Sequence, residues 1–212
     1  MAEMNTGSAT ALAAEGGVSV EAPSPQRERI RLAAVQLFTR QGFAGTSMKQ
    51  LAHALDMVPA NLYNYFSSKE AILFDVLHHQ LSKLHEHTIH VVKRDDRPSA
   101  QLRALAENLV LSDLKDPMAA FVGIQGVKGL SHGNLEVVSQ LMRDVRMAWG
   151  GVIQRGVDEK EFDVHDVKLC TLSILTLCSS VATWYQPDGP YSPEYVASGI
   201  ADSALRMAGV RI

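Results

Sequence analysis

Residues 29–74, RIRLAAVQLFTRQGFAGTSMKQLAHALDMVPANLYNYFSSKEAILF, determine the fold of this chain. Apolar residues recur at helical spacing up to Phe38, and Gly42 follows where a left-handed backbone would end the helix. Ser47 and Gln50 have the spacing of a capping box, which marks the start of a further helix. The first part of the stretch therefore predicts one long helix followed by a short one.

The second part of the stretch predicts two more helices. Asp56 ends the short helix, and aspartate tolerates the left-handed backbone of a tight turn better than most residues. Pro59 begins the next helix, since proline is favoured at the first helical position, while Ser67 and Glu70 have the spacing of another capping box. Two short helices joined by a tight turn match the helix-turn-helix unit, whose second helix reads the DNA major groove.

Four runs in this stretch carry a family resemblance: AAVQLFTRQGF, TS, LAHAL and NLYNYFSSKEAIL. In this order they resemble the N-terminal domain of the TetR family of bacterial transcriptional regulators. The resemblance implies an all-α fold of about nine helices, with an N-terminal three-helix helix-turn-helix head and a C-terminal helical ligand-binding and dimerisation domain. The chain departs from the family pattern where Asp56 replaces a common glycine, Val58 a capping serine or threonine, and Tyr65 a frequent histidine.

The predicted recognition helix carries residue types that read and grip DNA. Asn61 suits a bidentate pair with adenine, and Ala60 suits contact with a thymine methyl group. The hydroxyls of Tyr63 and Tyr65 suit phosphate oxygens, and Lys69 lies at a helix N-terminus, where backbone amides also favour an anion. The residues predicted to bind DNA, some of them from the family resemblance, are Thr46, Ser47, Lys49, Pro59, Ala60, Asn61, Tyr63, Asn64, Tyr65 and Lys69.

Composition divides the chain into three parts. Residues 1–25 carry three acidic residues and no basic one in a low-complexity stretch, which predicts a disordered arm. We expect the DNA-binding domain in residues 26–70 and the ligand-binding and dimerisation domain in residues 71–212. Residues 26–83 contain seven lysines and arginines and four acidic residues, a net charge of +3 in a chain whose total is −3. A basic head fits phosphate binding.

Cysteine usage and the absence of a signal peptide predict a cytoplasmic protein. Cys170 and Cys178 are eight positions apart in an expected helix, roughly 12 Å along its axis, so they cannot bridge each other. Reduced thiols are typical of the cytoplasm. The run from Leu169 to Pro187 has no charged residue, but it contains six serines and threonines and its apolar residues favour one side. We therefore expect a buried or interface helix and no membrane span.

The rest of the chain predicts helices throughout. They are expected from Ser68 to Val92, from Pro98 or Ser99 to Lys115, from Pro117 to a looser part around Gly126 and Gly129, from Ser131 to Val157, from Val164 to Tyr185, and from Ser192 to Ala208.

Two patterns offer alternative functions. Gly129–Gly133 reads GLSHG, the G-x-S-x-G pattern of hydrolase nucleophile elbows, which would make Ser131 a nucleophile. That motif needs a preceding strand and a sheet, whereas this region predicts helices, so we do not expect an enzyme. A histidine-rich helix would suit a metal-responsive regulator, through His78, His79, His85, His87 and His90. No carboxylate or cysteine pattern completes that site, and we expect neither a metal nor a cofactor.

The C-terminal half predicts a ligand pocket, because its helices carry more apolar surface than a thin bundle needs. The candidate lining residues are Leu105, Met118, Phe121, Gln125, Met142 and Trp149. Residues 178–197, CSSVATWYQPDGPYSPEYVA, resemble a TetR subgroup of which many members control lipid or steroid breakdown and sense acyl-CoA thioesters; Gln186 replaces the usual arginine of that pattern.

The last two helices predict a dimer, because small residues allow close helix approach and Trp184 supplies a large apolar anchor. The candidate interface residues are Leu172, Leu175, Ser179, Thr183 and Trp184. The complete prediction is a homodimeric repressor that binds a palindromic double-stranded operator and is released by a small amphipathic ligand, with an acyl-CoA as the favoured class.

Overall fold

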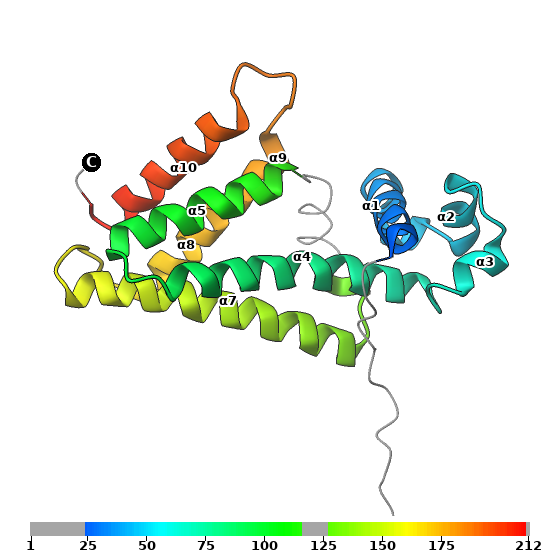
Figure 1. Ribbon diagram of the computed structural model, residues 1–212, viewed down its shortest axis with the longest axis horizontal. Helices are drawn as coiled ribbons and strands as arrows, with labels where there is room; N and C mark the ends of the chain where they lie inside the picture. Colours follow the sequence, from blue (N-terminus) through cyan, green and yellow to red (C-terminus); the bar gives the residue numbers. More distant parts are fainter. Residues whose placement is uncertain (1–23, 116–126, 211–212) are drawn as a thin grey trace, which may run out of the picture.

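The computed structural model describes residues 24–115 and 127–210, and all regular structure in these ranges is helical, as predicted (Figure 1). The head consists of α1 (Pro25–Gly45), α2 (Met48–Ala54) and α3 (Pro59–Tyr63), and α4 (Lys69–Val92) runs from the head into the body. The body continues with α5 (Pro98–Lys115), the 3-10 helix η1 (Val127–Gly129), α7 (His132–Asp158), α8 (Val167–Ser179), α9 (Val181–Trp184) and α10 (Pro193–Met207).

The local signals of the head act as predicted. The Ser47 hydroxyl accepts from the Gln50 amide at 3.2 Å, and the Gln50 side chain accepts from the Ser47 amide at 2.8 Å, which completes the capping box of α2. Gly42 adopts φ 76° and kinks α1 three residues before its end, where the sequence predicted that the helix would stop, and Asp56 adopts φ 53° in the turn before α3. Val58, at the N-terminus of α3, makes no capping side-chain hydrogen bond.

The predicted capping box of Ser67 and Glu70 is wrong by one residue. Ser68 caps α4 by accepting from the Ala71 amide at 3.0 Å. Glu70 instead accepts from the Ser131 amide at 2.7 Å and from the Asn134 side chain at 2.9 Å. The N-terminal amides of α7 have no partners within their own helix, so they outcompete the local cap for this carboxylate. These hydrogen bonds hold the pKa of Glu70 below its usual value.

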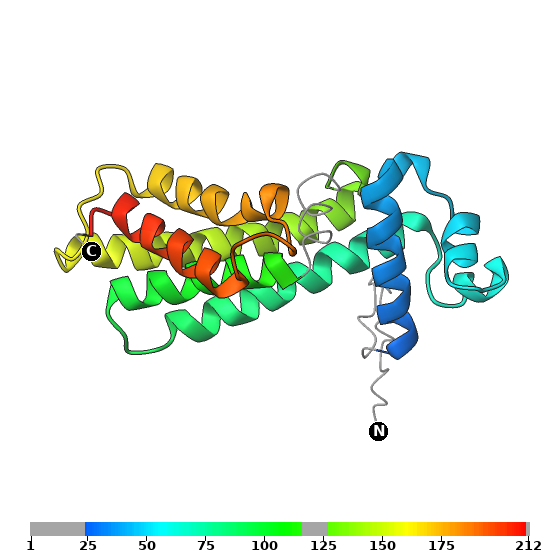
Figure 2. The ribbon, with the colours of Figure 1, turned by 90° about the horizontal axis from the view of Figure 1, so that it is seen from above.

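Two apolar clusters share α4, which makes this helix the connection between head and body. Its first half, including Leu73 and Leu77, packs in the head cluster with α1–α3, while Val91 near its end belongs to the body cluster. Val138 of α7 also packs in the head cluster. In Figures 1 and 2, α7 runs alongside α4 toward the head.

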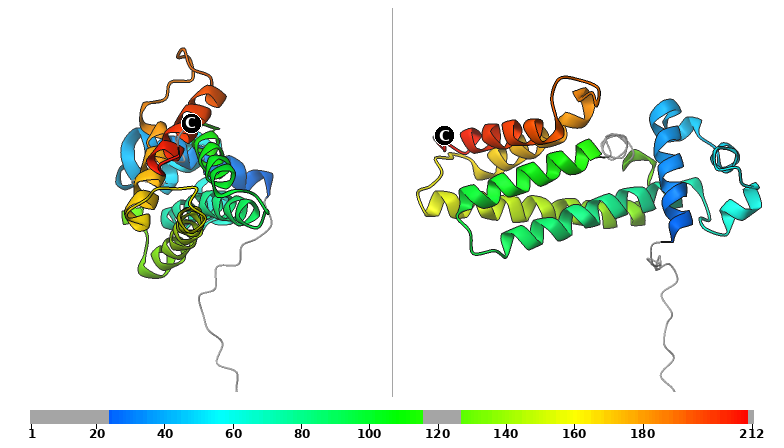
Figure 3. Two further views of the ribbon diagram at one scale, coloured as in Figure 1. Left: turned by 90° about the vertical axis from the view of Figure 1, so that its left-hand side faces the viewer. Right: turned by 45° about the horizontal axis from the view of Figure 1, so that its top comes forward.

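The body is a bundle in which α10 lies along α5, with α8 beside them (Figure 3). The predicted bounds of α5, α7 and α10 are confirmed to within about two residues. The helix predicted to begin at Pro117 lies outside the described residues.

The helix predicted from Val164 to Tyr185 is interrupted. It divides at Ser180 into α8 and α9. The Ser180 hydroxyl donates to the Leu177 carbonyl at 2.7 Å, and the Thr183 hydroxyl donates to the Ser180 carbonyl at 2.7 Å. Such side-chain bonds compete with the helical ladder and explain the break.

The segment Val167–Trp184 is long and apolar enough to cross a membrane by length and composition, with a mean hydropathy of 1.4. In this fold 22% of the segment is buried, and Ile174, Cys178 and Val181 pack in the body cluster. The segment is therefore part of the bundle. Both cysteines are free, as predicted.

The G-x-S-x-G pattern forms a close helix junction and not a nucleophile elbow. Ser131 is the N-cap residue of α7, and η1 precedes it where an elbow requires a strand. A Cβ atom on Gly129 would lie 2.8 Å from the Phe43 ring and 2.9 Å from Leu73. Gly129 is thus needed for η1 to approach the head.

The two glycines of this pattern should respond differently to alanine. Gly129→Ala should lower the free energy of unfolding by about 1–3 kcal/mol, because the added methyl group meets Phe43 and Leu73. Gly133→Ala is the matched control, since its Cβ would have no neighbour within 4 Å and alanine favours a helix. Thermal and denaturant unfolding measure both changes, and equal stability of the two variants would contradict the tight junction.

Candidate nucleic-acid interface and ligand cavity

The recognition helix α3 presents nearly all its side chains to solvent. Pro59, Ala60, Asn61 and Tyr63 are exposed, whereas Leu62 is fully buried and anchors the helix in the head cluster. In the described part of the chain, no side-chain hydrogen bond engages Asn61. Its amide therefore remains available for a base edge.

The flanks of α3 add further exposed polar groups. Asn64 and Tyr65 follow the helix and are exposed, and Ser47 and Lys49 are exposed at the start of α2. The Ser47 hydroxyl is occupied as the α2 cap, while the Lys49 side chain makes no hydrogen bond or ion pair to a described residue. This distribution suits base reading by α3 and phosphate contacts beside it.

The side chains of Lys69 and Thr46, both predicted to contact DNA, are engaged in contacts within the head. The Lys69 ammonium donates to the carbonyls of Phe43 at 2.6 Å and Thr46 at 2.7 Å, and lies 4.3 Å from the centre of the Phe43 ring. Thr46 is 2% exposed, and its hydroxyl donates to the Gly42 carbonyl at 2.9 Å. Lys69 thus donates to two carbonyls at the end of α1, and the Phe43 carbonyl also accepts from the Thr46 amide at 3.3 Å.

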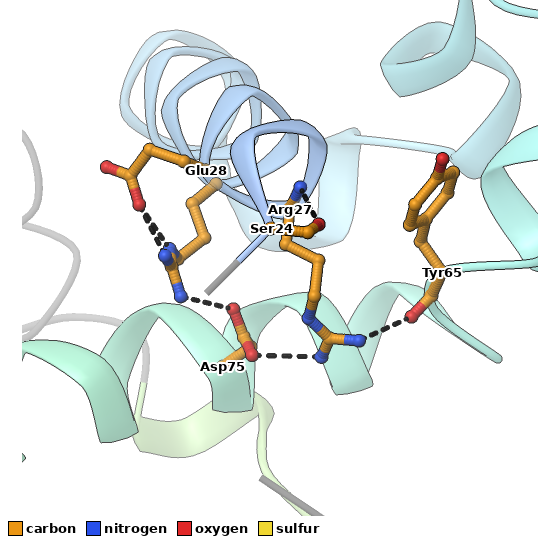
Figure 4. A network of polar contacts seen from close by, with 6 residues as sticks. Ser24, Arg27, Glu28, Tyr65 and Asp75 are labelled. Atoms are coloured by element: carbon orange, nitrogen blue, oxygen red, sulfur yellow. Dashed lines mark hydrogen bonds and ion pairs between the residues drawn. The ribbon is translucent and has the colours of Figure 1, made fainter. Parts of the chain in front are cut away.

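An ionic network missed by sequence reasoning joins three elements of the head. Arg27 donates to Asp75 at 3.1 Å and to the Tyr65 carbonyl at 3.1 Å, while Arg31 donates to the other oxygen of Asp75 at 3.1 Å and pairs with Glu28 (Figure 4). The network ties α1 and the segment after α3 to α4. Its only signal in the sequence was the pair of arginines four positions apart on α1.

An apolar cavity of about 130 Å³ lies among α4, α5, α7 and α8. It is lined by Leu77, Gln80, Leu81, Leu84, Leu109, Ser112, Asp113, Val138, Met142 and Ser179.

The cavity agrees only in part with the predicted ligand residues. Met142 lines it, as predicted, whereas Leu105 and Trp149 pack in the body cluster and do not. Ser179, assigned to the dimer interface, faces the cavity because the helical turn of α8 directs it inward. The remaining candidates, Met118, Phe121 and Gln125, lie outside the described residues.

Asp113 is the acidic group of the cavity wall. It is 5% exposed, and burial raises the pKa of its carboxyl to about 7. Burial, followed by the proximity of Asp113, raises the pKa of the Cys178 thiol to about 12. No described residue forms a hydrogen bond or ion pair with the Asp113 side chain, so this carboxyl is left for another partner.

A larger cleft of about 610 Å³ adjoins the cavity between α1, α4 and α5, and shares Gln80, Leu84 and Ser112 with it. Its basic and imidazole side chains are Arg31, His79, Lys83, His87 and Lys115, opposed by the carboxylate of Glu28.

The histidines of α4 do not form a metal site. Burial, together with Arg31 and Lys83, lowers the pKa of His79, so its imidazole is neutral at pH 7. Within residues 24–115 and 127–210, no group of three His, Cys, Asp or Glu side chains is placed to hold a metal ion. The metal-responsive alternative therefore has no geometric support in the described parts.

Some predicted interface residues lie on an uncovered apolar surface. Leu172 is 36% and Trp184 48% exposed, and Thr183 is exposed beside them. Leu175 is half-buried against the body cluster. Tyr195 of α10 extends the exposed surface.

An exposed recognition helix on a compact head, joined to a helical body with a cavity, defines a helix-turn-helix transcriptional regulator. Residues 30–76 match the family described as bacterial regulatory proteins, tetR family, and residues 95–208 match the tetracyclin repressor-like C-terminal domain. The chain belongs to the TetR family of DNA-binding repressors, which are not enzymes. The predicted family and fold class are confirmed.

Relatives extend over most of the chain. The transcriptional repressor KstR2 of Rhodococcus jostii is 26% identical over 177 residues, which span 82% of this chain and 86% of that protein. The crystal structure of PfmR from Thermus thermophilus is 31% identical with a TM-score of 0.77, and the match covers 84% of this chain and 97% of PfmR. AibR, crystallised with isovaleryl coenzyme A and operator DNA, is 21% identical with a TM-score of 0.75, covering 86% and 97%.

Mutations should distinguish a residue that reads bases from a residue that binds phosphates. Asn61→Ala should cost about 1–3 kcal/mol of operator binding and relax one base position, because the amide no longer pairs with its base. Lys49→Ala should weaken binding to every sequence alike and reduce the salt slope by about one unit. Fluorescence anisotropy with single-base operator variants measures both effects.

Lys69→Ala should change the stability of the head. It should lower the melting temperature, since the carbonyls of Phe43 and Thr46 lose their donor. An equal loss of affinity on operator and scrambled DNA for Asn61→Ala would remove Asn61 from the base-reading residues.

Proposed function

We propose that this chain acts in the cytoplasm as a homodimeric repressor that an acyl-CoA thioester releases from a palindromic operator. The observation that carries the proposal is the apolar cavity that adjoins a basic cleft, with Gln80, Leu84 and Ser112 common to both. An acyl-CoA combines an apolar acyl group with a polar, phosphate-bearing carrier. The apolar cavity suits the acyl group and the basic cleft suits the phosphate-bearing carrier, and the two hollows adjoin each other as these two parts do.

The size of the cavity favours a small acyl group. A cavity of about 150 Å³ takes a molecule of benzene size, and the volume here is about 130 Å³. Leu81, Leu109 and Met142 supply apolar walls for such a group. The AibR complex with isovaleryl coenzyme A supports the same ligand class.

The cleft suits the charged part of the ligand. Arg31, Lys83 and Lys115 offer positive charge to phosphates, and the neutral imidazole of His79 adds a hydrogen-bond donor or acceptor. The cleft holds one carboxylate, Glu28, which already pairs with Arg31.

The same cleft supplies a route to the head. Its walls come from α1 of the head and from α4 and α5 of the body. A phosphate at Arg31 would compete with Asp75 for the guanidinium, and Asp75 also holds Arg27 against the Tyr65 carbonyl. Ligand binding would thereby favour a different position of α1 and α3 relative to α4.

A dimer completes the proposal. A palindromic operator requires two heads about one helical turn apart, roughly 34–36 Å between centres. The exposed apolar residues Leu172 and Trp184, together with Tyr195, offer an isologous surface on α8–α10. A second copy of the chain would cover this surface.

Acyl-CoA binding should depend on the basic cleft. Short-chain acyl-CoAs should release operator DNA from the unmodified protein, and Lys83→Gln should weaken their binding about threefold to tenfold by removing one phosphate contact. Lys93→Gln is the matched control, because Lys93 is exposed at the far end of α4, outside the cleft. Calorimetry measures binding and anisotropy measures release.

The ligands tested also include free coenzyme A and molecules of classes other than acyl-CoA. Release by free coenzyme A as strong as by its thioesters would contradict a role for the cavity. Release by another class with no response to any acyl-CoA would overturn the ligand assignment and leave the repressor intact.

The dimer should depend on Leu172. Leu172→Arg should give monomers and a large loss of operator affinity, because an unpaired charge buried at the twofold surface costs several kcal/mol. Val137→Arg is the control, since Val137 is comparably exposed at 44% but lies on α7, away from this surface. Sedimentation velocity reads the oligomeric state, and an unchanged dimer in Leu172→Arg would place the interface elsewhere.

A further inference from the structure

The wall of the apolar cavity contains one carboxyl group that has no partner among the described residues. Asp113 of α5 lines the cavity, is 5% exposed, and has no hydrogen-bond or ion-pair partner among the described residues. Burying a carboxyl group without a partner is destabilising. The surrounding wall is mostly hydrocarbon, with Ser112, Gln80 and Ser179 as its other polar members.

We infer that Asp113 determines the specificity of the cavity by accepting a hydrogen bond from a hydroxyl group on the apolar part of the effector. The inference rests on the proposed function and deepens it: the favoured effectors are hydroxyacyl-CoA thioesters. A plain hydrocarbon group fills the cavity but supplies no donor to Asp113, whereas a hydroxyl supplies the missing donor.

Other polar groups fit Asp113 less well. A carboxylate on the ligand would repel it, and an ammonium group would lose its hydration among walls formed by Leu81, Leu109 and Met142. A ketone only accepts hydrogen bonds, so it pairs only with the protonated acid. A hydroxyl donates to the carboxyl in either protonation state and brings no charge into the cavity.

The protonation state of Asp113 gives this hydroxyl a measurable signature. Burial raises the pKa of Asp113 to about 7, and a donated hydrogen bond favours the ionised form. Affinity for a hydroxylated ligand should therefore rise with pH through neutrality, whereas a ketone would show the opposite trend.

Other titratable groups near Asp113 do not produce the same signature. On α8, Cys178 keeps its proton, because its pKa is about 12. The cavity walls from α4 and α7 carry no titratable side chain, and His79 and Lys83 of α4 face the adjoining cleft. The titratable groups of the cleft would contact the same coenzyme A carrier in every thioester. Their contribution to the pH dependence of binding therefore cancels when a hydroxylated ligand is compared with its partner without the hydroxyl.

The experiment compares pairs of acyl-CoA thioesters with acyl chains of four to six carbons. The two members of a pair have the same chain length, and only one of them carries a hydroxyl group. The position of that hydroxyl along the chain varies from pair to pair. Binding and operator release are measured at about pH 6 and about pH 8. In at least one pair, the unmodified protein should bind the hydroxylated member about tenfold or more tightly than its partner at the higher pH, with a smaller preference at the lower pH.

Variants isolate the carboxyl group. Asp113→Leu should abolish the preference and improve binding of the thioester without the hydroxyl, and Asp113→Asn should keep a reduced preference that no longer changes with pH. Asp95→Asn, at an exposed acid in the connection between α4 and α5, should behave like the unmodified protein. If the leucine substitution impairs folding, the near-isosteric Asp113→Asn variant still tests the role of the carboxyl group.

The outcomes separate this inference from the proposed function. Equal binding of both members of every pair, or an unchanged preference in Asp113→Leu, overturns the role of Asp113 while acyl-CoA release stands. A preference that grows at low pH also overturns it. Release by hydroxylated hydrocarbons without coenzyme A, with no response to any thioester, would support Asp113 and reject the acyl-CoA assignment.

Discussion

The carboxylate of Asp75 is the interaction on which the geometry of the head depends. Its two oxygens bind Arg27 and Arg31, both from α1, and Arg27 continues to the Tyr65 carbonyl just after α3 (Figure 4). One carboxylate on α4 thus holds both the supporting helix and the end of the recognition helix. The side chains are 10–20% exposed, so removing Asp75 would take one carboxylate away from two poorly hydrated cations.

A second polar contact ties the head to the body on the side of α7. Glu70 accepts from Ser131 and Asn134, and Gly129 lets η1 approach Phe43 closely. The head is therefore held through Asp75 beside the cleft and through Glu70 beside α7. A charge-assisted hydrogen bond contributes about 1.5–3 kcal/mol, and allosteric couplings between sites are typically about 1–3 kcal/mol. Exchanging one such bond for a ligand contact has the right magnitude to change operator affinity.

Sequence reasoning succeeded where a feature depends on neighbours in the chain. The Ser47–Gln50 box and the left-handed Asp56 follow from a few adjacent residues, and both are present. It failed where partners are distant in sequence: Glu70 contacts Ser131 61 residues away, and Lys69 contacts Phe43 26 residues earlier. A lysine at a helix N-terminus opposes the helix dipole, and that conflict was the available sign of another partner.

The apolar cavity was predictable in kind, but its lining residues were not predictable in detail. Surplus apolar surface predicted a cavity, and Met142 lines it, but an apolar side chain such as Trp149 has the same pattern whether it faces a cavity or the core. Asp113 escaped notice because one acid in an amphipathic helix ordinarily faces solvent. Only the fold shows that this position turns inward.

In the proposed mechanism, contacts in the cavity select the effector and contacts in the cleft transmit its binding to the head. The cavity of about 130 Å³ touches no residue of α1, although Leu77 and Val138 of the head cluster are part of its wall, so in the proposed mechanism its contacts would discriminate between acyl groups. The cleft of about 610 Å³ includes Arg31 and Leu32 of α1, so ligand contacts made there would act on the head. A ligand filling only the cavity would make no contact with α1, and a ligand with equal affinity for the two head positions shifts no equilibrium. The proposed release would therefore depend on both parts of an amphipathic molecule, which is the physical reason for proposing a thioester carrier and not an acyl group alone.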